Sequence, residues 1–407
     1  MQDERNMQNK KIYLIGIGTG TYGGLTVGAA KLMKSCDLIF GAKRMLEVAD
    51  GCGAKRIAAY QPKEIRVHLN QTENQGWQCA CVLLSGDVGF YSGAKQLLEE
   101  FHDYAVELIP GISSLSAFCA VIGVSWDEVS AVSLHGRQEN AIGRIDRERY
   151  TFCLFSGVQG LRELAGKLQY YGLDKVILHI GENVGYPEQR IYCMTPREAS
   201  CGTFGSLLVA VIENPCPKEC LFPEIEDSEW IRGDVPMTKS EVRSLAIQKL
   251  GMPKNAVLYD IGAGTGSVGI QAAVCYPDSS VYAIEYKESA VDLIKQNQRK
   301  FRADNLHTVL GKAPGALEKL PAATHAFIGG SAGNLRAVLG VLWEKNPRTV
   351  IVISLITLET LSDVLSAAKE FEIEPQVVSV QVSRAKKAGA YHLMNGQNPV
   401  MLVKLAP

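Results

Sequence analysis

A short glycine-rich stretch, residues 257–266 (Val-Leu-Tyr-Asp-Ile-Gly-Ala-Gly-Thr-Gly), constrains the fold of this chain more than any other feature. Residues 257–261 are mostly apolar and stop at glycine, which predicts a buried strand. Gly262, Gly264 and Gly266 follow. Because glycine adopts backbone conformations that other residues avoid, the chain can turn there and approach a ligand closely. Residues 267–275 then predict a helix whose N-terminus favours a polar or anionic group.

Two acidic residues beside this turn narrow the choice of ligand. Residues 280–285 predict the next parallel strand, which ends at Glu285, where a carboxylate can accept hydrogen bonds from both hydroxyls of a ribose. Asp260 lies just before the glycines, a placement more usual for S-adenosylmethionine sites than for nicotinamide sites. The pattern resembles the first motif of Rossmann-like methyltransferases. A purely structural interpretation stays open, in which the glycines serve a turn and Glu285 caps a helix.

The whole chain sets broader limits. Its 407 residues exceed one ordinary core and predict two or three domains. A formal net charge of -1 provides no overall basic field for nucleic acid. The longest apolar runs, residues 207–212 and 350–353, are too short to cross a bilayer, and the polar N-terminus does not predict a signal peptide. The 11 cysteines and 7 histidines lack metal-ligand spacing, so we expect no metal and a reducing, cytoplasmic location.

Three strands predicted in the first half of the chain end in loops of glycine and small polar residues. The strands cover residues 11–16, 78–84 and 106–109. At the carboxyl end of a parallel strand, such loops suit a small ligand. The candidate ligand-binding residues in them are Gly16, Gly18, Gly20, Ser85, Gly86, Asp87, Gly89, Phe90, Ser113 and Ser114. Each loop taken alone is equally consistent with a plain strand-to-helix turn, in which Asp87 or the serines cap helices.

Strands alternate with helices on both sides of a proline-containing, acidic segment, residues 216–230. That segment has no clear period and is interpreted as a linker. The alternation predicts two α/β domains, residues 10–215 and 231–407, and residues 400–405 are expected to close the second sheet as an antiparallel strand. Residues 383–387, with three cations, are expected to be a solvated loop between the last strands.

The motifs taken together resemble a known family, the corrin-ring methyltransferases of cobalamin biosynthesis that alkylate carbons 5 and 15 and decarboxylate one acetate arm. The N-terminal half is similar to the tetrapyrrole methylase fold through residues 16–20, 84–92, 110–114 and 181–187. The C-terminal half is similar to the carbon-15 enzyme through residues 236–239, 260–266, 328–331 and 398–400. The resemblance implies a tetrapyrrole methylase fold of two α/β/α subdomains, followed by a Rossmann-like class I methyltransferase domain with a mostly parallel seven-stranded sheet.

The resemblance also implies the chemistry and the residues that serve it. Each domain would hold one S-adenosylmethionine and act on one precorrin substrate, the first at carbon 5 and the second at carbon 15 with loss of carbon dioxide. The cofactor residues implied in the second domain are Thr238, Asp260, Gly262, Gly264, Thr265, Gly266, Glu285, Gly329 and Gly330. Cations suited to the substrate carboxylates are Lys239, Arg243, Arg336, Arg384, Lys386 and Lys387. No catalytic residue is assigned, since methyl transfer to an electron-rich carbon depends on positioning and needs no protein nucleophile.

Three positions depart from the family pattern. Thr19 and Val88 stand where proline is frequent, and Lys312 stands where the family tends to have aspartate near the adenine. Lys312 is therefore not assigned as a cofactor ligand. By resemblance alone we also expect a homo-oligomer, without a nucleic-acid or membrane partner.

Three other functions were weighed. A methyltransferase of RNA or protein with a partner-binding first domain predicts an Asn-Pro-Pro-Tyr-type loop after the fourth strand, whereas residues 329–333 read Gly-Gly-Ser-Ala-Gly. A nicotinamide oxidoreductase predicts Gly-x-Gly-x-x-Gly, and residues 262–266 have the last gap one residue too short. A corrinoid-binding protein without catalysis would have no use for two nucleoside-type loops. The sequence leaves open whether the substrate carries cobalt and which methylation comes first.

Overall fold

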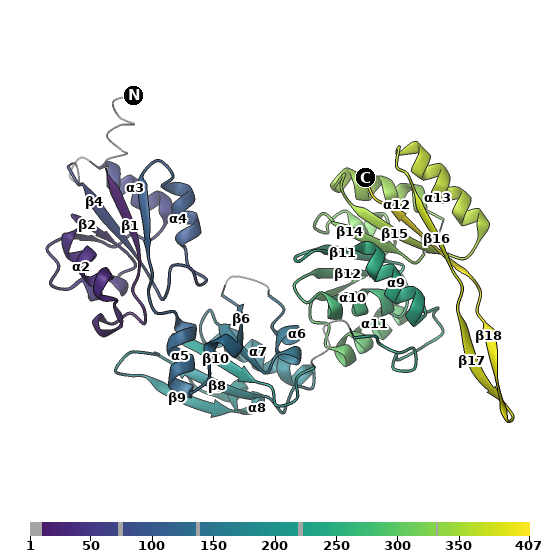
Figure 1. Cartoon of the computed structure of the whole chain (residues 1–407), viewed down its shortest axis with the longest axis horizontal. Helices are drawn as coiled ribbons and strands as arrows, with labels where there is room; N and C mark the ends of the chain where they lie inside the picture. The colour runs from purple at the N-terminus through teal and green to yellow at the C-terminus, as the bar shows by residue number, and fades with distance from the viewer. Residues whose placement is uncertain (1–9, 72–75, 136–138, 219–222, 331–332) are drawn as a thin grey trace. The chain divides into compact units, whose positions relative to one another are not determined.

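The computed structural model describes residues 10–71, 76–135, 139–218, 223–330 and 333–407. Ser331 and residues 219–222 of the expected linker lie outside these ranges. The chain divides into two units, here called unit 1 and unit 2 (Figure 1). Unit 1 comprises residues 1–138, 149–166 and 174–215, and unit 2 comprises residues 139–148, 167–173 and 216–407. Within the described ranges, no helix is both long enough and apolar enough to cross a membrane.

Unit 1 contains two five-stranded sheets. The first is parallel throughout, with the order β3-β2-β4-β1-β5. Its strands are β1 (Lys11–Gly16), β2 (Leu38–Phe40), β3 (Lys55–Ile57), β4 (Cys79–Leu84) and β5 (Ala105–Ile109). Helices α3 (Pro62–Asn70) and α4 (Ala94–Glu100) pack on one face, and α2 (Val27–Ser35) packs on the other. β1 lies inside the sheet because Ile12 and Leu14 bury one face while Ile15 buries the opposite one.

The second sheet of unit 1 is mixed, with the order β6-β7-β10-β8-β9. Its strands are β6 (Val129–Ser133), β7 (Tyr150–Leu154), β8 (Ile177–Glu182), β9 (Arg190–Met194) and β10 (Leu208–Glu213). Helices α5 (Ser114–Ile122), α8 (Pro196–Cys201) and most of α7 (Val158–Tyr170) belong to unit 1 with this sheet, whereas α6 (Ala141–Arg147) falls in unit 2. α5 buries Phe118 against Phe152 and Val211 of the sheet. Two sheets with their own helices agree with the expected pair of α/β subdomains.

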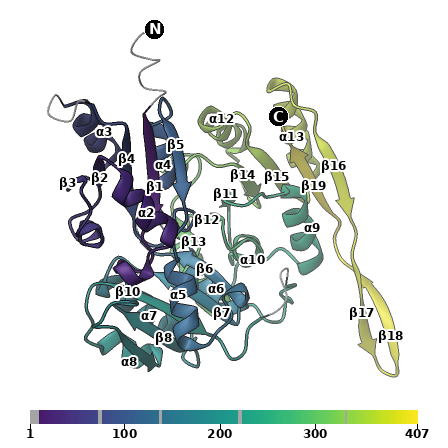
Figure 2. The ribbon, with the colours of Figure 1, turned by 60° about the vertical axis from the view of Figure 1, so that its left-hand side comes forward.

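Unit 2 is built on a seven-stranded sheet with the order β13-β12-β11-β14-β15-β19-β16 (Figures 1 and 2). Its strands are β11 (Val257–Ile261), β12 (Ser280–Glu285), β13 (Leu306–Leu310), β14 (His325–Ile328), β15 (Val350–Leu355), β16 (Gln376–Val380) and β19 (Val400–Leu405). β11 to β15 are parallel to one another, and β19 runs antiparallel to both neighbours. The predicted mostly parallel, seven-stranded Rossmann-like sheet is confirmed.

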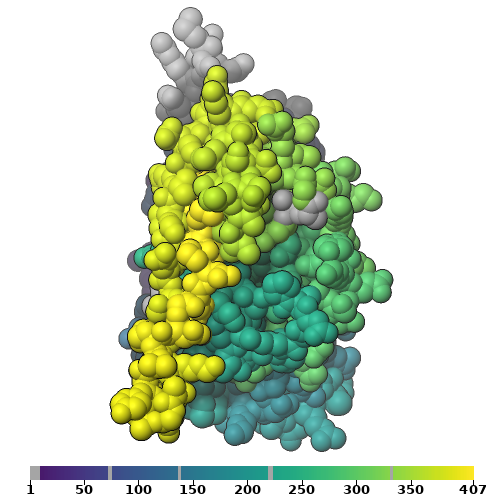
Figure 3. All heavy atoms as spheres, turned by 90° about the vertical axis from the view of Figure 1, so that its right-hand side faces the viewer, coloured from purple at the N-terminus to yellow at the C-terminus, as the bar shows by residue number. Residues whose placement is uncertain are grey.

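The connection between β16 and β19 corrects one expectation. Residues 383–387 are not a loop but form β17 (Ser383–Ala388), which pairs with β18 (Tyr391–Gly396) as a separate antiparallel ribbon. Nearly every residue of the ribbon is exposed, and its side chains stand out in yellow in Figure 3. The charge run had favoured a solvated loop, but Ala388 pairs with Tyr391 across a two-residue turn in which Gly389 has a φ of +63°, a conformation that favours a hairpin.

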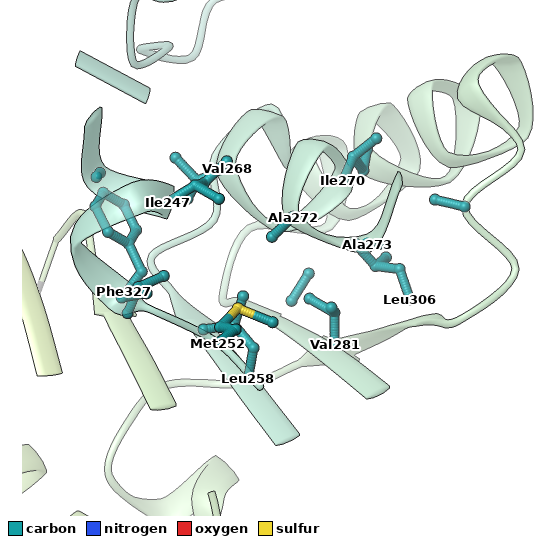
Figure 4. Close-up of a cluster of buried hydrophobic side chains, with 14 of the residues drawn as sticks. Ile247, Met252, Leu258, Val268, Ile270, Ala272, Ala273, Val281, Leu306 and Phe327 are labelled. Carbon is teal, nitrogen blue, oxygen red and sulfur yellow. The ribbon is translucent and has the colours of Figure 1, made fainter. Parts of the chain in front are cut away.

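Two apolar layers fix the sheet of unit 2 between helices. Helices α9 (Ser240–Leu250), α10 (Ser267–Cys275) and α11 (Glu288–Phe301) bury one face, with Leu258, Val268 and Phe327 in the core shown in Figure 4. Helices α12 (Leu335–Lys345) and α13 (Leu358–Glu370) bury the other face. Ile225 and Trp230, from the segment expected to be a linker, also belong to the first core, so that end of the segment packs as part of unit 2.

Candidate active site

A cavity of about 370 Å³ opens at the carboxyl ends of four neighbouring strands of unit 2. In a doubly wound sheet the ends of parallel strands converge at one edge, where ligands usually bind. Seven of the predicted cofactor residues line this cavity, namely Thr238, Asp260, Gly262, Gly264, Glu285, Gly329 and Gly330. Thr265 and Gly266 do not appear in the lining, since they turn the chain into α10. Most of the cofactor residues predicted for this domain therefore line one cavity. The alternative prediction, in which the glycines serve only a turn, had been left open.

The glycines bring two loops into contact. Gly262 has a φ of +71°, and a Cβ placed there would meet the carbonyl oxygen of Gly330 at 2.6 Å. The loops after β11 and β14 thus pass so close that a side chain at position 262 would separate them. Among the described residues, which do not include residues 331–332, no atom lies within 4 Å of the ideal Cβ position of Gly330, so this side of Gly330 is open to the cavity. One glycine is needed for packing, and the other leaves room in the cavity.

Glu285 shapes the opposite wall of the cavity. Its Oε2 accepts a hydrogen bond from the Gly264 N–H at 3.0 Å, and its Oε1 accepts from the N–H groups of Tyr286 at 2.9 Å and Lys287 at 3.1 Å. The side chain is 6% exposed. These bonds hold the carboxylate in one orientation, and Oε2, which accepts one of them, keeps acceptor capacity for a further donor. Such a pre-oriented acceptor suits vicinal hydroxyl groups.

Asp260 anchors the turn from beneath. Its Oδ2 accepts from the Gly269 N–H at 2.8 Å, which ties the end of β11 to the first turns of α10. Burial raises the pKa of Asp260 to about 7, the nearby charge of Glu285 adds to the rise, and the Gly269 bond opposes it. At neutral pH the group is thus partly protonated, and it holds the loop in place beneath the cavity.

Arg243 requires a correction. We expected it to bind a substrate carboxylate, but it is fully buried. Its Nε donates to Gln271 Oε1 at 2.6 Å, its Nη1 donates to the carbonyl oxygen of Thr238 at 2.8 Å, and the side chain pairs with Asp227. Because every face of the guanidinium is committed to protein groups, Arg243 instead fixes the segment that carries Thr238, one wall of the cavity.

The other predicted cations lie on the surface of unit 2. Arg384 donates to both carboxylate oxygens of Glu241, and this pairing lowers the pKa of Glu241 to about 2. Arg336 forms an exposed ion pair with Glu370. Lys386 and Lys387 are exposed on β17, whereas Lys239 is half-buried at the residue that precedes α9. None of these cations lines the cavity, so their role toward a substrate stays a prediction.

In unit 1 the predicted loops also converge. Gly18 and Gly86 exchange two backbone hydrogen bonds of 3.0 and 2.9 Å, which join the loops after β1 and β4. A Cβ at Gly111 would meet the carbonyl oxygens of Gly86 at 2.4 Å and Gly16 at 2.5 Å. The ends of three neighbouring strands are therefore packed backbone against backbone. These glycines are needed for that contact, whatever ligand they also serve.

The remaining predicted residues of unit 1 have structural partners. Asp87 accepts from the Gly89 N–H at 2.8 Å and the Gly111 N–H at 3.0 Å, so it joins two of the loops. Ser113 caps α5 by accepting from the Ser116 N–H at 3.0 Å, and Ser114 begins that helix. The ring of Phe90 packs against Phe152 with centroids 5.9 Å apart. Ser113 matches the capping interpretation that we left open, whereas Asp87 does not cap the following helix, because the N-cap of α4 is Gly93. Ligand binding by these residues, and by Gly20 and Ser85, stays a prediction.

Some cavity residues were not predicted. Lys287 and Lys312 line it, together with Val235, Pro236, Ser267, Val268, Tyr286, Gly311, Ala313 and Phe327. Asn297 was also missed: it is fully buried and donates to the carbonyl oxygen of Thr265 at 3.1 Å, so it steadies the glycine turn from α11. Lys312 follows β13, the third strand of unit 2 in chain order and the edge strand of its sheet, and that position could have identified Lys312 despite its departure from the family pattern.

The doubly wound sheet, the glycine-lined cavity at its carboxyl edge and the acidic residue after the second strand define unit 2 as a Rossmann-like methyltransferase domain. Comparisons with known proteins agree. The family model for the tetrapyrrole (corrin/porphyrin) methylases matches residues 11–199, and the model for the precorrin methyltransferase domain matches residues 229–406. The chain belongs to the precorrin methyltransferases of the C5,15 type, in which both domains occur in one polypeptide.

Individual relatives cover either half or the whole of the chain. The probable cobalt-precorrin-6B C(15)-methyltransferase (decarboxylating) of Pyrobaculum calidifontis is 40% identical over 184 residues, which are 44% of this chain and 94% of that protein. The precorrin-6Y C(5,15)-methyltransferase [decarboxylating] of Sinorhizobium sp. is 25% identical over 394 residues, 96% of this chain and 94% of that one. A crystal structure of precorrin-6y C5,15-methyltransferase from Geobacter metallireducens is 32% identical, with a TM-score of 0.43, and covers 45% of this chain and 97% of that chain.

Proposed function

We propose that the chain methylates a precorrin macrocycle at carbons 5 and 15 and removes the carboxyl group of the acetate side chain on ring C, as a step of cobalamin biosynthesis. The observation that carries this proposal is the glycine-lined cavity of unit 2, in a chain of which 96% aligns with a C5,15-methyltransferase. Carbon-15 methylation and decarboxylation belong to unit 2 in this proposal, and carbon-5 methylation belongs to unit 1.

The residues of the unit 2 cavity fit S-adenosylmethionine. Glu285 is an oriented acceptor for the ribose hydroxyls, and the open side of Gly330 leaves room beside it. The cavity volume of about 370 Å³ falls in the range of small-molecule sites. The cofactor supplies the methyl group when bound. The chain's own residues position the macrocycle and exclude water, and this suffices because no protein nucleophile is required for methyl transfer to an electron-rich carbon.

We extend the proposal to a second cofactor site in unit 1, at the meeting point of the loops after β1, β4 and β5. Its support is that the loops after three neighbouring parallel strands meet at one edge of the sheet, which is where ligands usually bind in such sheets. Calorimetry with S-adenosylhomocysteine tests it directly. Two sites in the intact protein, one lost in Gly18→Arg and the other in Gly264→Arg, are expected, and one site in the intact protein would reject the second.

Three further statements belong to this proposal. Residues 10–215 form the carbon-5 domain, residues 216–230 the connection and residues 231–407 the carbon-15 domain. Lys239, Arg336, Arg384, Lys386 and Lys387 contact substrate carboxylates. The protein works as a homo-oligomer in the cytoplasm, without a nucleic-acid or membrane partner, and the ten free cysteines of the described residues suit a reducing compartment.

Mass spectrometry tests the reaction itself. The protein is incubated with S-adenosylmethionine and a precorrin-6-type macrocycle, either metal-free or carrying cobalt. A gain of two methyl groups with loss of one carbon dioxide is expected, and the form that reacts assigns the pathway. Cofactor binding without a change in either macrocycle would instead favour a methyltransferase that acts on another substrate.

A further inference from the structure

The carboxyl edge of the unit 2 sheet continues beyond the cavity. In sheet order, the cavity is lined by the loops that follow β13, β12, β11 and β14, represented by Lys312, Glu285, Gly262 and Gly330. The next strand is β15, which pairs in parallel with β14 so that Ile353 lies opposite Ile328. The loop that follows β15 is therefore the direct neighbour of the glycine wall of the cavity.

This neighbouring loop exposes two large aliphatic side chains. Ile356 is 66% exposed and Leu358 is 73% exposed, while Leu355, the last residue of β15, is 5% exposed. We call Ile356 and Leu358 the apolar ledge. A single exposed aliphatic side chain needs no explanation, but two of them beside a ligand cavity indicate a binding surface.

The start of α13 does not account for the ledge. Thr357 caps the helix by accepting from the Thr360 N–H at 3.3 Å. An apolar residue before such a cap often packs against the fourth helical residue, here Leu361, as a hydrophobic staple. Ile356 remains two-thirds exposed, however, and Leu358 is more exposed still. The helix start therefore leaves most of the ledge uncovered.

We propose that Ile356 and Leu358 receive an apolar face of the conjugated macrocycle while carbon 15 is methylated, and that they help select a macrocyclic substrate. The inference rests on the proposed function and deepens it. The next features along the edge are cationic: β16 runs parallel to β15 through their shared partner β19, so the β17–β18 ribbon with exposed Lys386 and Lys387 begins at the same edge. An apolar ledge between a cofactor cavity and these cations matches a ring with apolar faces and a carboxylate rim.

The test is the double variant Ile356→Asn/Leu358→Asn in the full-length protein. We expect KM for carbon-15 methylation of the precorrin to rise about tenfold or more, because two aliphatic contacts are lost. Affinity for S-adenosylhomocysteine, carbon-5 methylation and the unfolding temperature are expected to stay at wild-type values. Leu365→Asn is the matched control, since Leu365 is 40% exposed on the same helix α13 and away from the strand end.

Each outcome bears on the inference. If the KM of the double variant stays within twofold of the wild-type value, and the wild-type enzyme is active at carbon 15, the inference about the ledge is overturned while the proposed function stands. A fall in oligomer mass of the double variant, measured by light scattering, overturns it in favour of a contact between copies of the chain. If the wild-type protein modifies neither form of the macrocycle, the proposed function is rejected, and with it the inference that the ledge binds the macrocycle.

Discussion

The glycine-rich loops of unit 1 and unit 2 form the same type of hydrogen bond, but with different structural results. In both, a carboxylate at a strand end accepts backbone N–H groups: Asp87 accepts from Gly89 and Gly111, and Glu285 accepts from Gly264 and its own loop. In unit 1 the bonded loops close on one another, since three glycine backbones meet at Cβ distances of 2.4–2.7 Å. In unit 2 the bonded loops enclose a cavity.

This difference shows that a glycine motif indicates first that two backbone segments pass close to each other, and only in some cases that a ligand binds there. Gly111 and Gly262 face the backbone of another loop, whereas Gly330 faces open space. Only a glycine of the second kind, such as Gly330, leaves volume for a small molecule. Substitutions that add one methyl group, or exchange one carboxylate, therefore distinguish the architectural glycines and acids from those that serve the ligand.

Gly111→Ala is expected to have the largest effect on stability. The added Cβ would lie 2.4 and 2.5 Å from two carbonyl oxygens, so backbone must move, and overpacking of this kind costs about 3 kcal/mol. The added methyl group of Gly330→Ala meets no atom of the described residues within 4 Å, so this variant should unfold like wild type while it weakens S-adenosylhomocysteine binding. Denaturant unfolding and calorimetry measure both. Equal stability of the two variants would contradict the proposal that Gly111 is needed for loop packing and Gly330 is not.

Asp260→Asn should change how stability depends on pH. The native pKa of Asp260 is about 7, raised by burial from an unfolded value of about 3.9. The folded state therefore holds a proton that the unfolded state releases, so this stabilisation is complete below pH 4 and is lost as pH rises through 7. Between pH 5 and pH 8 the wild type should lose about 3 kcal/mol relative to the variant.

Asparagine keeps an oxygen for the Gly269 N–H, so the anchor of α10 is preserved in this variant. Urea unfolding at pH 5, 6, 7 and 8 gives the two slopes. Parallel slopes for the wild type and Asp260→Asn would show that the carboxyl group titrates alike in the folded and unfolded states.

Glu285→Gln and Asp87→Asn form the next pair. Each exchange replaces an acceptor oxygen with an NH₂ group that faces backbone N–H donors. In unit 2 we expect about a tenfold loss of S-adenosylhomocysteine affinity, because the oriented acceptor lies in the cavity wall. In unit 1 we expect a loss of stability of about 1 kcal/mol, with binding in unit 2 unchanged. Glu288→Gln, an exposed neighbour outside the cavity, is the control for the first variant.

The sequence predicted what strand ends determine and missed what packing determines. Gly262, Gly264 and Glu285 were placed in one site because parallel strands bring their carboxyl ends to one edge. Arg243 was misjudged, since it had been grouped with Lys239 among the cations that suit substrate carboxylates. α9 begins at Ser240, so Lys239 precedes the helix while Arg243 turns into the core toward Gln271. Which face of a helix is buried depends on the partners that fold against it, and a single charged residue does not reveal them.

Lys239→Gln is expected to have the smallest effect, and it separates the two units most cleanly. Lys239 is half-buried and follows Thr238, which lines the cavity of unit 2. Lys239 can therefore reach a substrate carboxylate at the opening of this cavity. Loss of one partly exposed ion pair should raise KM at carbon 15 up to about fivefold and leave stability near wild type. Carbon-5 methylation should not change if the two sites work independently. Lys295→Gln, an exposed lysine of α11, is the control, and an equal rise of KM at both carbons would mean that one shared site serves both methylations.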